Sequence, residues 1–353
     1  MGFKREVMPI FLVIILLLPY GYFKAGEAVY DIVAKTNTDC WGNFDHNTPE
    51  SFSHLRDETP LNESVYQENI SSEIMDGMDE YFWPSYSTAM IEVPDEDLWL
   101  SAWYYDQNES MPWVIFVHGI RGCKSGGNIL MPAGMLINAG FNVIVFDLRD
   151  HGQSSIEDDR VSAGQKEWRD VIAVHDWLID EHNATVGQIG LFGNSMGAGT
   201  AAITFAQDDR IEAIWLDSGF SDMGKIIEEE LEFQGLPTFL GGAGIFAGKI
   251  VTGEDLTKFS PLEAAETIGD RHMYVVHGES DIRVRVHHGQ SMCDIATEEG
   301  TNSGENVGCW IQDSRIRYDF GDELKSDEHV SLMLTNTLEY EEKLIDFFTN
   351  SFD

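Results

Sequence analysis

The 353-residue sequence predicts an α/β fold with a mostly parallel sheet covered by helices on both faces. Short continuous apolar runs alternate with segments of helical periodicity, and most runs end in glycine or a polar turn. One run, Ile189–Phe192, leads through Gly-Asn-Ser-Met-Gly directly into an alanine-rich helical pattern. Continuous apolar strands of this kind are buried on both faces, which requires helices above and below the sheet.

The expected elements follow in chain order. Ala89–Val93 and Leu98–Tyr105 are predicted to be antiparallel strands joined by a Pro-Asp-Glu-Asp turn. Later strands are expected at Trp113–Val117, Val143–Phe146, Ile189–Phe192, Ala213–Leu216 and Met273–Val276, with a weaker pattern at Arg315–Tyr318. Helices are expected at about Ile129–Ala139, Ala163–Glu181, Met196–Ala206, Val286–Ala296 and Leu332–Phe348.

One interval interrupts this alternation. From Asp217 to Pro261 no strand pattern occurs; an acidic helix at Ile226–Phe233 is followed by the glycine-rich apolar stretch Leu236–Ile250. We interpret residues of about 220–262 as a helical cap inserted over a substrate pocket. A pair of ordinary surface helices is the alternative.

The N-terminus has the pattern of a targeting segment. Lys4 and Arg5 precede the apolar run Val7–Tyr20, and small residues near Ala28 suit a signal peptidase. Residues 1–28 are therefore predicted to be a signal peptide or, if uncleaved, a signal anchor that contacts the membrane through residues 7–23. Either form exports the rest of the chain, which is then secreted or membrane-anchored. A buried N-terminal helix is the alternative, disfavoured because apolar residues fill every face of the run.

The remaining chain divides into two parts by composition. Residues 29–88 form a polar, acidic extension that is expected to wrap the domain, and residues 89–353 form the α/β domain with its cap. The whole chain carries 22 Lys+Arg against 61 Asp+Glu, a net charge of -39. Because such a surface repels phosphates, we exclude a nucleic-acid partner.

Four cysteines are present, and export would permit disulfides. Cys293 and Cys309 flank one polar stretch and are the preferred pair, which leaves Cys40 to join Cys123. The cysteines and histidines do not have zinc-ligand spacing, so neither a metal nor a cofactor is predicted.

Ser195 lies in the sharpest motif, Gly193-Asn194-Ser195-Met196-Gly197. A Gly-x-Ser-x-Gly segment between a strand and a helix indicates a strained turn that exposes the serine hydroxyl at a helix N-terminus. A simple serine N-cap in a glycine-rich turn is the alternative. A dehalogenase is excluded, because that chemistry needs a carboxylate where Ser195 stands.

Two further motifs follow predicted strands. His277-Gly278-Glu279-Ser280-Asp281 comes after Met273–Val276, and Asp327-Glu328-His329-Val330 comes before the last helix. Asp217 and Asp222, which follow the preceding strand Ala213–Leu216, are the alternatives to Asp281 as the acidic residue of the site. His287 and His288 lie on a predicted helix and are expected at the surface.

From about Ala89 to the C-terminus the chain resembles the α/β-hydrolase superfamily, in particular its serine aminopeptidase-like or BEM46-like branch. The resemblance is carried by His118-Gly119, by Asp147–Ser154 (DLRDHGQS), by the Ser195 motif, by His277–Asp281 and by the late His329. Within DLRDHGQS, Asp150 stands where the family often has glycine.

The resemblance implies a role for each of these positions. Ser195 would be the nucleophile, His329 the general base and Asp281 the residue that orients the base. The backbone N–H groups of Ile120 and Met196 would form the oxyanion hole. His118 and His151 would shape loops rather than act as bases.

The predicted activity is hydrolysis of a carboxylic ester or related acyl bond in a small molecule, through an acyl-enzyme. An esterase is favoured over a peptidase because no added peptide-gating domain is evident. Membrane-anchored lipase-like or thioesterase-like enzymes, a peptidase-like acyl hydrolase, and a non-catalytic binding protein remain alternatives.

Overall fold

The computed structural model describes residues 3–36, 40, 46–53, 71–72, 78–301, 304–314, 316–320 and 323–352; for 3–17, 316–320 and 323–327 it describes the backbone alone. An eight-stranded sheet runs through the body in the order β1-β2-β4-β3-β5-β6-β7-β8. The strands are β1 Ser87–Val93, β2 Leu98–Tyr105, β3 Trp113–Val117, β4 Asn142–Phe146, β5 Ile189–Asn194, β6 Ala213–Asp217, β7 His272–Gly278 and β8 Val307–Gln312. The β1–β2 and β2–β4 pairs are antiparallel and all others are parallel.

Helices cover both faces of this sheet, as the continuous apolar strands require. Strand β3 shows how the faces divide, because Ile115 and Val117 belong to one hydrophobic cluster while Val114 and Phe116 belong to the other. The first cluster contains apolar residues of α5 Trp168–His182, α6 Met196–Gln207 and α10 His287–Glu299. The second contains those of α4 Gly127–Asn138, α11 Leu332–Thr335, α12 Thr337–Phe352 and the short helix η2 Asp79–Tyr81.

The structure corrects one expected element at the C-terminal edge of the sheet and adds a strand that was not expected there. Of the segment expected at Arg315–Tyr318, Arg315 lies outside the described residues, and the rest does not join the central sheet: β9 Ile316–Phe320 pairs with β10 Glu323–Asp327 in a separate hairpin. The edge strand is β8, which pairs in parallel with β7. Its sequence, VGCWIQ, is half-exposed, so it lacks the continuous apolar pattern of a central strand.

Helix α5 begins at Trp168, five residues later than expected. Ala163 and Gly164 have positive φ values of 51° and 97°, which a right-handed helix cannot contain. The side chain of Glu167 accepts hydrogen bonds from the backbone N–H groups of Ser162 and Gly164 and stabilises this turn. The final helix is divided into α11 and α12 at Asn336, where φ is -133° and ψ is 47°.

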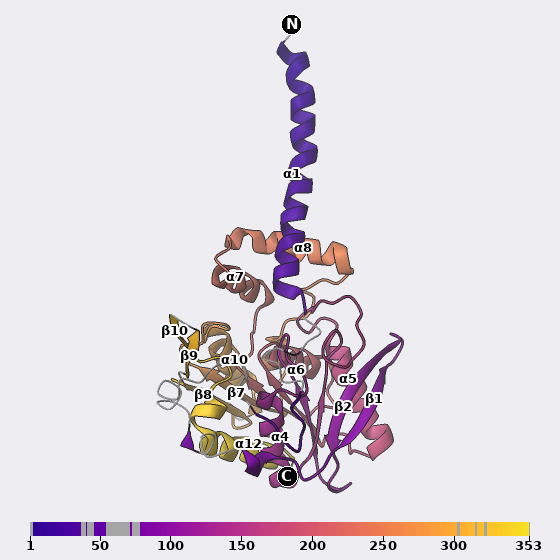
Figure 1. Cartoon of the computed structure of the whole chain (residues 1–353), viewed down its shortest axis with the longest axis vertical. Helices are drawn as coiled ribbons and strands as arrows, with labels where there is room; N and C mark the ends of the chain where they lie inside the picture. Colours follow the sequence, from indigo (N-terminus) through magenta and orange to yellow (C-terminus); the bar gives the residue numbers. More distant parts are fainter. Residues whose placement is uncertain are drawn as a thin grey trace.

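Between β6 and β7 the chain forms a cap of α7 Met223–Phe233, η3 Thr238–Leu240 and α8 Gly241–Thr252, followed by the short helix α9 Glu263–Glu266. In Figure 1 the cap lies beyond the sheet, and α1 Phe3–Ala34 crosses α8 and projects away from the body. Helix α1 continues to Ala34, and Val29, Tyr30 and Ala34 are buried.

Among the described residues, no helix combines the length and the apolar character needed to span a membrane. Most of the predicted apolar run Val7–Tyr20 lies in the part of α1 whose side chains are outside the description.

Candidate active site

Ser195 occupies the turn between β5 and α6 with φ 53° and ψ -124°. This is a strained conformation for a residue with a side chain. It persists because the surroundings fix it: the backbone N–H of Ser195 donates to the carbonyl oxygen of Asp217 at 2.8 Å. Gly197 makes the turn possible, since a Cβ there would lie 2.1 Å from the carbonyl oxygen of Val117. The sequence motif therefore forms the sharp strand-to-helix turn that it predicts.

The loop after β3 packs directly against Ser195. A Cβ added at Gly119 would lie 3.0 Å from the Cβ and 3.4 Å from the Oγ of Ser195. Ile120 is the next residue after Gly119, so it directly follows the residue whose backbone lies against Ser195. Met196 is the first residue of α6, so its N–H is among those that an α-helix leaves without an intrahelical partner.

His329 lies between Ser195 and Asp281 and contacts both. Its Nε2 is 2.8 Å from Ser195 Oγ, and its Nδ1 is 2.8 Å from Asp281 Oδ2. The three residues come from the ends of β5 and β7 and from the loop after β10. The structure thus brings together the three side chains that the sequence singles out, with the imidazole accessible at 18% of its side-chain surface.

Asp281 is held in place as a carboxylate. Its Oδ1 accepts the backbone N–H groups of Arg283 at 2.7 Å and Val284 at 2.9 Å, which leaves Oδ2 for His329. Burial would raise its pKa, but the charge and hydrogen bond of His329 keep the pKa of Asp281 below its ordinary value. His277 supports the same loop by donating from Nε2 to the carbonyl oxygen of Val284 at 2.7 Å.

The rival carboxylates have other partners. Asp217 is buried and accepts hydrogen bonds from Tyr340 Oη at 2.8 Å and Ser218 Oγ at 2.9 Å. Burial raises the pKa of Asp217 to about 6. Asp222 caps α7, where its side chain accepts the backbone N–H of Lys225.

Sequence reasoning missed Ser218, which links Asp217 to the histidine loop. Ser218 Oγ accepts the backbone N–H of Val330 at 3.0 Å. Val330 has a φ of 54°, so the turn directly after His329 is strained and is fixed by this contact. The two partners are 112 positions apart, and no local pattern marks the serine.

His118 and His151 fix the loops beside the candidate oxyanion groups. His118 Nε2 accepts the N–H of Leu148 at 3.1 Å, and His151 Nε2 accepts the N–H of Arg121 at 3.1 Å. The opposite ring nitrogens donate to the carbonyl oxygens of Gly119 and Arg149. Burial lowers the pKa of His118 to about 3, so the ring is neutral and serves as a loop support.

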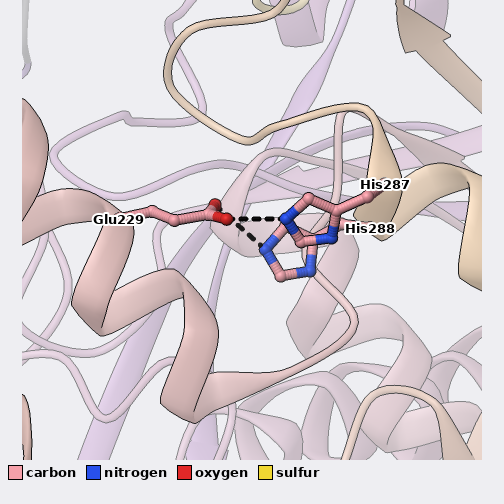
Figure 2. A group of neighbouring side chains, drawn as sticks. All are labelled: Glu229, His287 and His288. Carbon is pink, nitrogen blue, oxygen red and sulfur yellow. Dashed lines mark hydrogen bonds and ion pairs between the residues drawn. The ribbon is translucent and has the colours of Figure 1, made fainter.

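A second histidine cluster connects the cap to the body (Figure 2). Glu229 of α7 faces His287 and His288 of α10, with its Oε1 2.6 Å from His287 Nε2 and its Oε2 3.3 Å from His288 Nε2. The expectation that both histidines are surface residues is wrong for His288, which is completely buried. The first turn of α10 faces the cap here, which the helical pattern alone does not indicate.

This cluster also brings together side chains of metal-binding type, with ligand atoms within 4.8 Å of one another. However, His288 Nδ1 accepts the backbone N–H of Ser221 at 3.2 Å, so the proton of the neutral ring resides on Nε2, facing Glu229. A metal-bound histidine normally donates from its other nitrogen instead. We therefore interpret the cluster as a hydrogen-bonded link between cap and body.

Two disulfides are formed, Cys40–Cys123 and Cys293–Cys309, with Cα–Cα distances of 5.5 and 6.0 Å. These are the pairs favoured by the sequence. The first joins the segment after α1 to the loop that follows Ile120, and the second joins α10 to the edge strand β8.

A family model described as "alpha/beta hydrolase fold" matches residues 112–251, which span β3 to α8 and include Ser195. This chain has the α/β-hydrolase fold. The predicted fold is confirmed, whereas the serine aminopeptidase-like or BEM46-like branch stays a prediction.

Known proteins similar to this α/β-hydrolase-fold chain fall into two groups. Two curated Escherichia coli proteins, each described as "Uncharacterized 31.7 kDa protein in traX-finO intergenic region", are 33% identical over 145 residues. That match covers 40% of this chain, and the chain spans about half the length of these relatives. Among solved structures, the Pyrococcus furiosus esterase Pf2001 has a TM-score of 0.58 at 23% identity, covering 75% of this chain and 92% of the esterase. The Pyrococcus horikoshii acylaminoacyl peptidase has a TM-score of 0.53 at 15% identity, and the match covers 76% of this chain and 42% of the peptidase.

Proposed function

We propose that this chain is a serine hydrolase that cleaves a carboxylic ester or related acyl bond of a small molecule. The observation that carries the proposal is the continuous series of hydrogen-bond contacts from Asp281 through His329 to Ser195, each 2.8 Å long. A serine hydroxyl is a weak nucleophile unless a neighbouring base accepts its proton, and this geometry supplies that base.

In the proposed reaction, His329 Nε2 removes the proton from Ser195 Oγ as the oxygen attacks the substrate carbonyl carbon. The same nitrogen then gives the proton to the leaving group, which departs as the acyl-enzyme forms. Water, deprotonated by His329, then attacks the acyl carbon. The bond from this carbon to Ser195 Oγ breaks, Oγ takes back the proton from His329 Nε2, and the acid is released. Asp281 keeps the proton of Nδ1 in place and stabilises the imidazolium that forms in each step.

The developing oxyanion would be stabilised by the backbone N–H groups of Ile120 and Met196. The close approach of Gly119 to Ser195 and the position of Met196 at the start of α6 support this assignment. One such donor contributes roughly 3 kcal/mol to the stability of a transition state. Both groups belong to the backbone, so only the loop conformation determines their position.

We further propose that the α/β domain is exported. Its two disulfides support this, because such bonds persist mainly in oxidising compartments. Secreted and membrane-attached forms are both compatible with the sequence of residues 1–28, and the mass of the mature chain from its native host would distinguish them.

The decisive experiment is labelling of the protein with a fluorophosphonate, which reacts with activated serines. Peptide mapping should locate the label on Ser195, and Ser195→Ala and His329→Ala should abolish labelling while circular dichroism shows the native fold. The unlabelled wild-type protein should hydrolyse a p-nitrophenyl ester, and labelling of Ser195 should abolish this hydrolysis. Failure of the folded wild-type protein to react, at low and at high salt, would overturn the serine mechanism and favour a binding role.

A further inference from the structure

Helix α1 packs against α8 through an interface of small residues. A Cβ added at Gly26 would lie 2.1 Å from the carbonyl oxygen of Ala243, and one at Gly244 would lie 2.8 Å from Val29. Close approach of this kind requires glycine at the contact. Gly248 meets the ring of Tyr30 in the same way, so several turns of the two helices are in direct contact.

The contacts also define which side of α8 faces outward. Along α1 from the body, Tyr30 meets Gly248, then Gly26 meets Ala243, and then the hydroxyl of Tyr22 approaches Gly242 at 3.6 Å. Tyr22 lies one turn, about 6 Å, nearer the N-terminus than Gly26. The α8 face that contains Gly242 is therefore directed along α1 toward its N-terminus. In Figure 1 the N-terminal part of α1 extends from α8 away from the sheet.

That outward face is apolar and exposed. Phe246 and Ile250 follow Gly242 at intervals of four residues, which places them on the same side of the helix. They are 50% and 55% exposed, and Phe239 in η3, just before α8, is 77% exposed. On the adjoining part of α1, Leu18 is 67% exposed and Tyr20 is 61% exposed.

The same region lacks negative charge. Leu236–Thr252 contains no aspartate or glutamate, although these make up 61 of the 353 residues of the chain. Its single cation, Lys249, pairs with Asp255 at 2.6 Å. A solvated face of so acidic a protein would carry carboxylates, so their absence, together with exposed aromatic rings, indicates a surface that contacts something apolar.

We propose that the outer face of the cap, formed by Phe239, Phe246 and Ile250, rests on a lipid bilayer at the point where α1 leaves the protein. A bilayer is favoured over a second copy because α1, which packs on α8, exposes Leu18 and Tyr20 beyond this contact, and the sequence before Leu18 is the apolar run that begins at Val7. Aromatic and aliphatic side chains of this kind bury into the boundary between headgroups and acyl chains.

The net charge of -39 determines the kind of lipid surface that fits. Anionic headgroups repel the acidic body, so the contact is expected with zwitterionic lipid. There the burial of apolar side chains favours binding without repulsion between negative charges. This inference concerns the cap and α1 alone and does not depend on the proposed catalytic mechanism.

The test uses the full chain with one added cysteine, since all four native cysteines are in disulfides. An environment-sensitive NBD dye would be attached at Phe246→Cys, at Ile250→Cys or, as a control, at Val186→Cys. Val186 is 54% exposed and precedes β5, at the opposite end of that strand from Ser195. Each protein is mixed with phosphatidylcholine vesicles that contain a spin-labelled phosphatidylcholine.

At positions 246 and 250 we expect a blue-shifted emission and at least twofold quenching by the spin-labelled lipid, with neither change at position 186. Equal quenching at all three positions would overturn the proposal, because tethering through α1 alone would then explain vesicle binding. A blue shift at 246 and 250 that is already complete without vesicles would also overturn it and would indicate a second copy on this face. Fluorophosphonate labelling of the same variants reports separately on Ser195.

Discussion

The guanidinium of Arg121 donates from Nη2 to the carbonyl oxygen of Ile32 at 3.2 Å, and from Nε to that of Lys35 at 3.1 Å. These carbonyls lie at the end of α1, where an α-helix leaves acceptors without partners. Arg121 directly follows Ile120, and its own φ of 59° is strained. The end of α1 and the candidate oxyanion loop therefore hold each other in position, and the nearby Cys40–Cys123 disulfide joins the same two segments.

Arg121→Ala should loosen the loop that carries Ile120. We expect kcat for a p-nitrophenyl ester to fall roughly three- to tenfold with little change in KM, because an oxyanion donor acts mainly in the transition state. Arg285→Ala is the matched control, since Arg285 pairs with Glu232 at the cap surface. Equal rates for the wild type and both variants would show that the α1 contact does not position the loop.

The two buried aspartates near the histidine loop should differ sharply in their effect. Asp281→Asn should lower kcat by roughly 10³–10⁴-fold, because the amide cannot hold His329 in the required tautomer. Asp217→Asn should lower it less than tenfold, since Asp217 bonds to Tyr340 and Ser218. Steady-state kinetics on both variants would decide, and a reversed order would assign the acid to Asp217.

The link between cap and body should make stability depend on pH through His288. Burial lowers its pKa from 6.5 to about 4, so between these values the unfolded chain binds a proton that the folded chain does not. The free energy of unfolding should therefore fall as pH decreases from about 6.5 to about 4, with this residue contributing up to ~1.4 kcal/mol per pH unit.

Urea unfolding of the wild type and His288→Gln across this pH range measures that contribution. The variant removes the titrating group and keeps an amide near the position of Nε2, so its stability should depend less steeply on pH. Other buried histidines, such as His118, titrate in both proteins, and their effect cancels in the difference. Parallel curves for the two proteins would exclude His288 as a source of the pH dependence.

The two disulfides should contribute unequally to stability. Cys40–Cys123 closes a loop of 83 residues and Cys293–Cys309 one of 16 residues. Chain-entropy estimates for loops of these lengths are about 4.5 and about 3 kcal/mol. The double variants Cys40→Ala/Cys123→Ala and Cys293→Ala/Cys309→Ala should differ accordingly in urea unfolding, and a larger loss for the shorter loop would contradict the entropic explanation.

Several features of the fold could be predicted from short-range pattern alone. The central strands are continuous apolar runs because both faces are buried, and Leu98–Tyr105 and Trp113–Val117 were predicted with the bounds that the structure has. The turn at Ser195 follows from its glycines, whose missing Cβ atoms permit the contact with Val117. Edge strand β8 and the late start of α5 were missed, since half-exposed strands and positive-φ turns have weak sequence signals.

By itself, the sequence determined the α/β architecture and the chemical types at the candidate site, because periodicity and turn chemistry are local properties. Only the tertiary structure decided among the partners that the sequence left open. The pairing of Asp281 rather than Asp217 with His329, the burial of His288 against the cap, and the packing of α1 on α8 each join segments far apart in the chain. Such contacts depend on how complete elements pack together, and no local pattern encodes that arrangement.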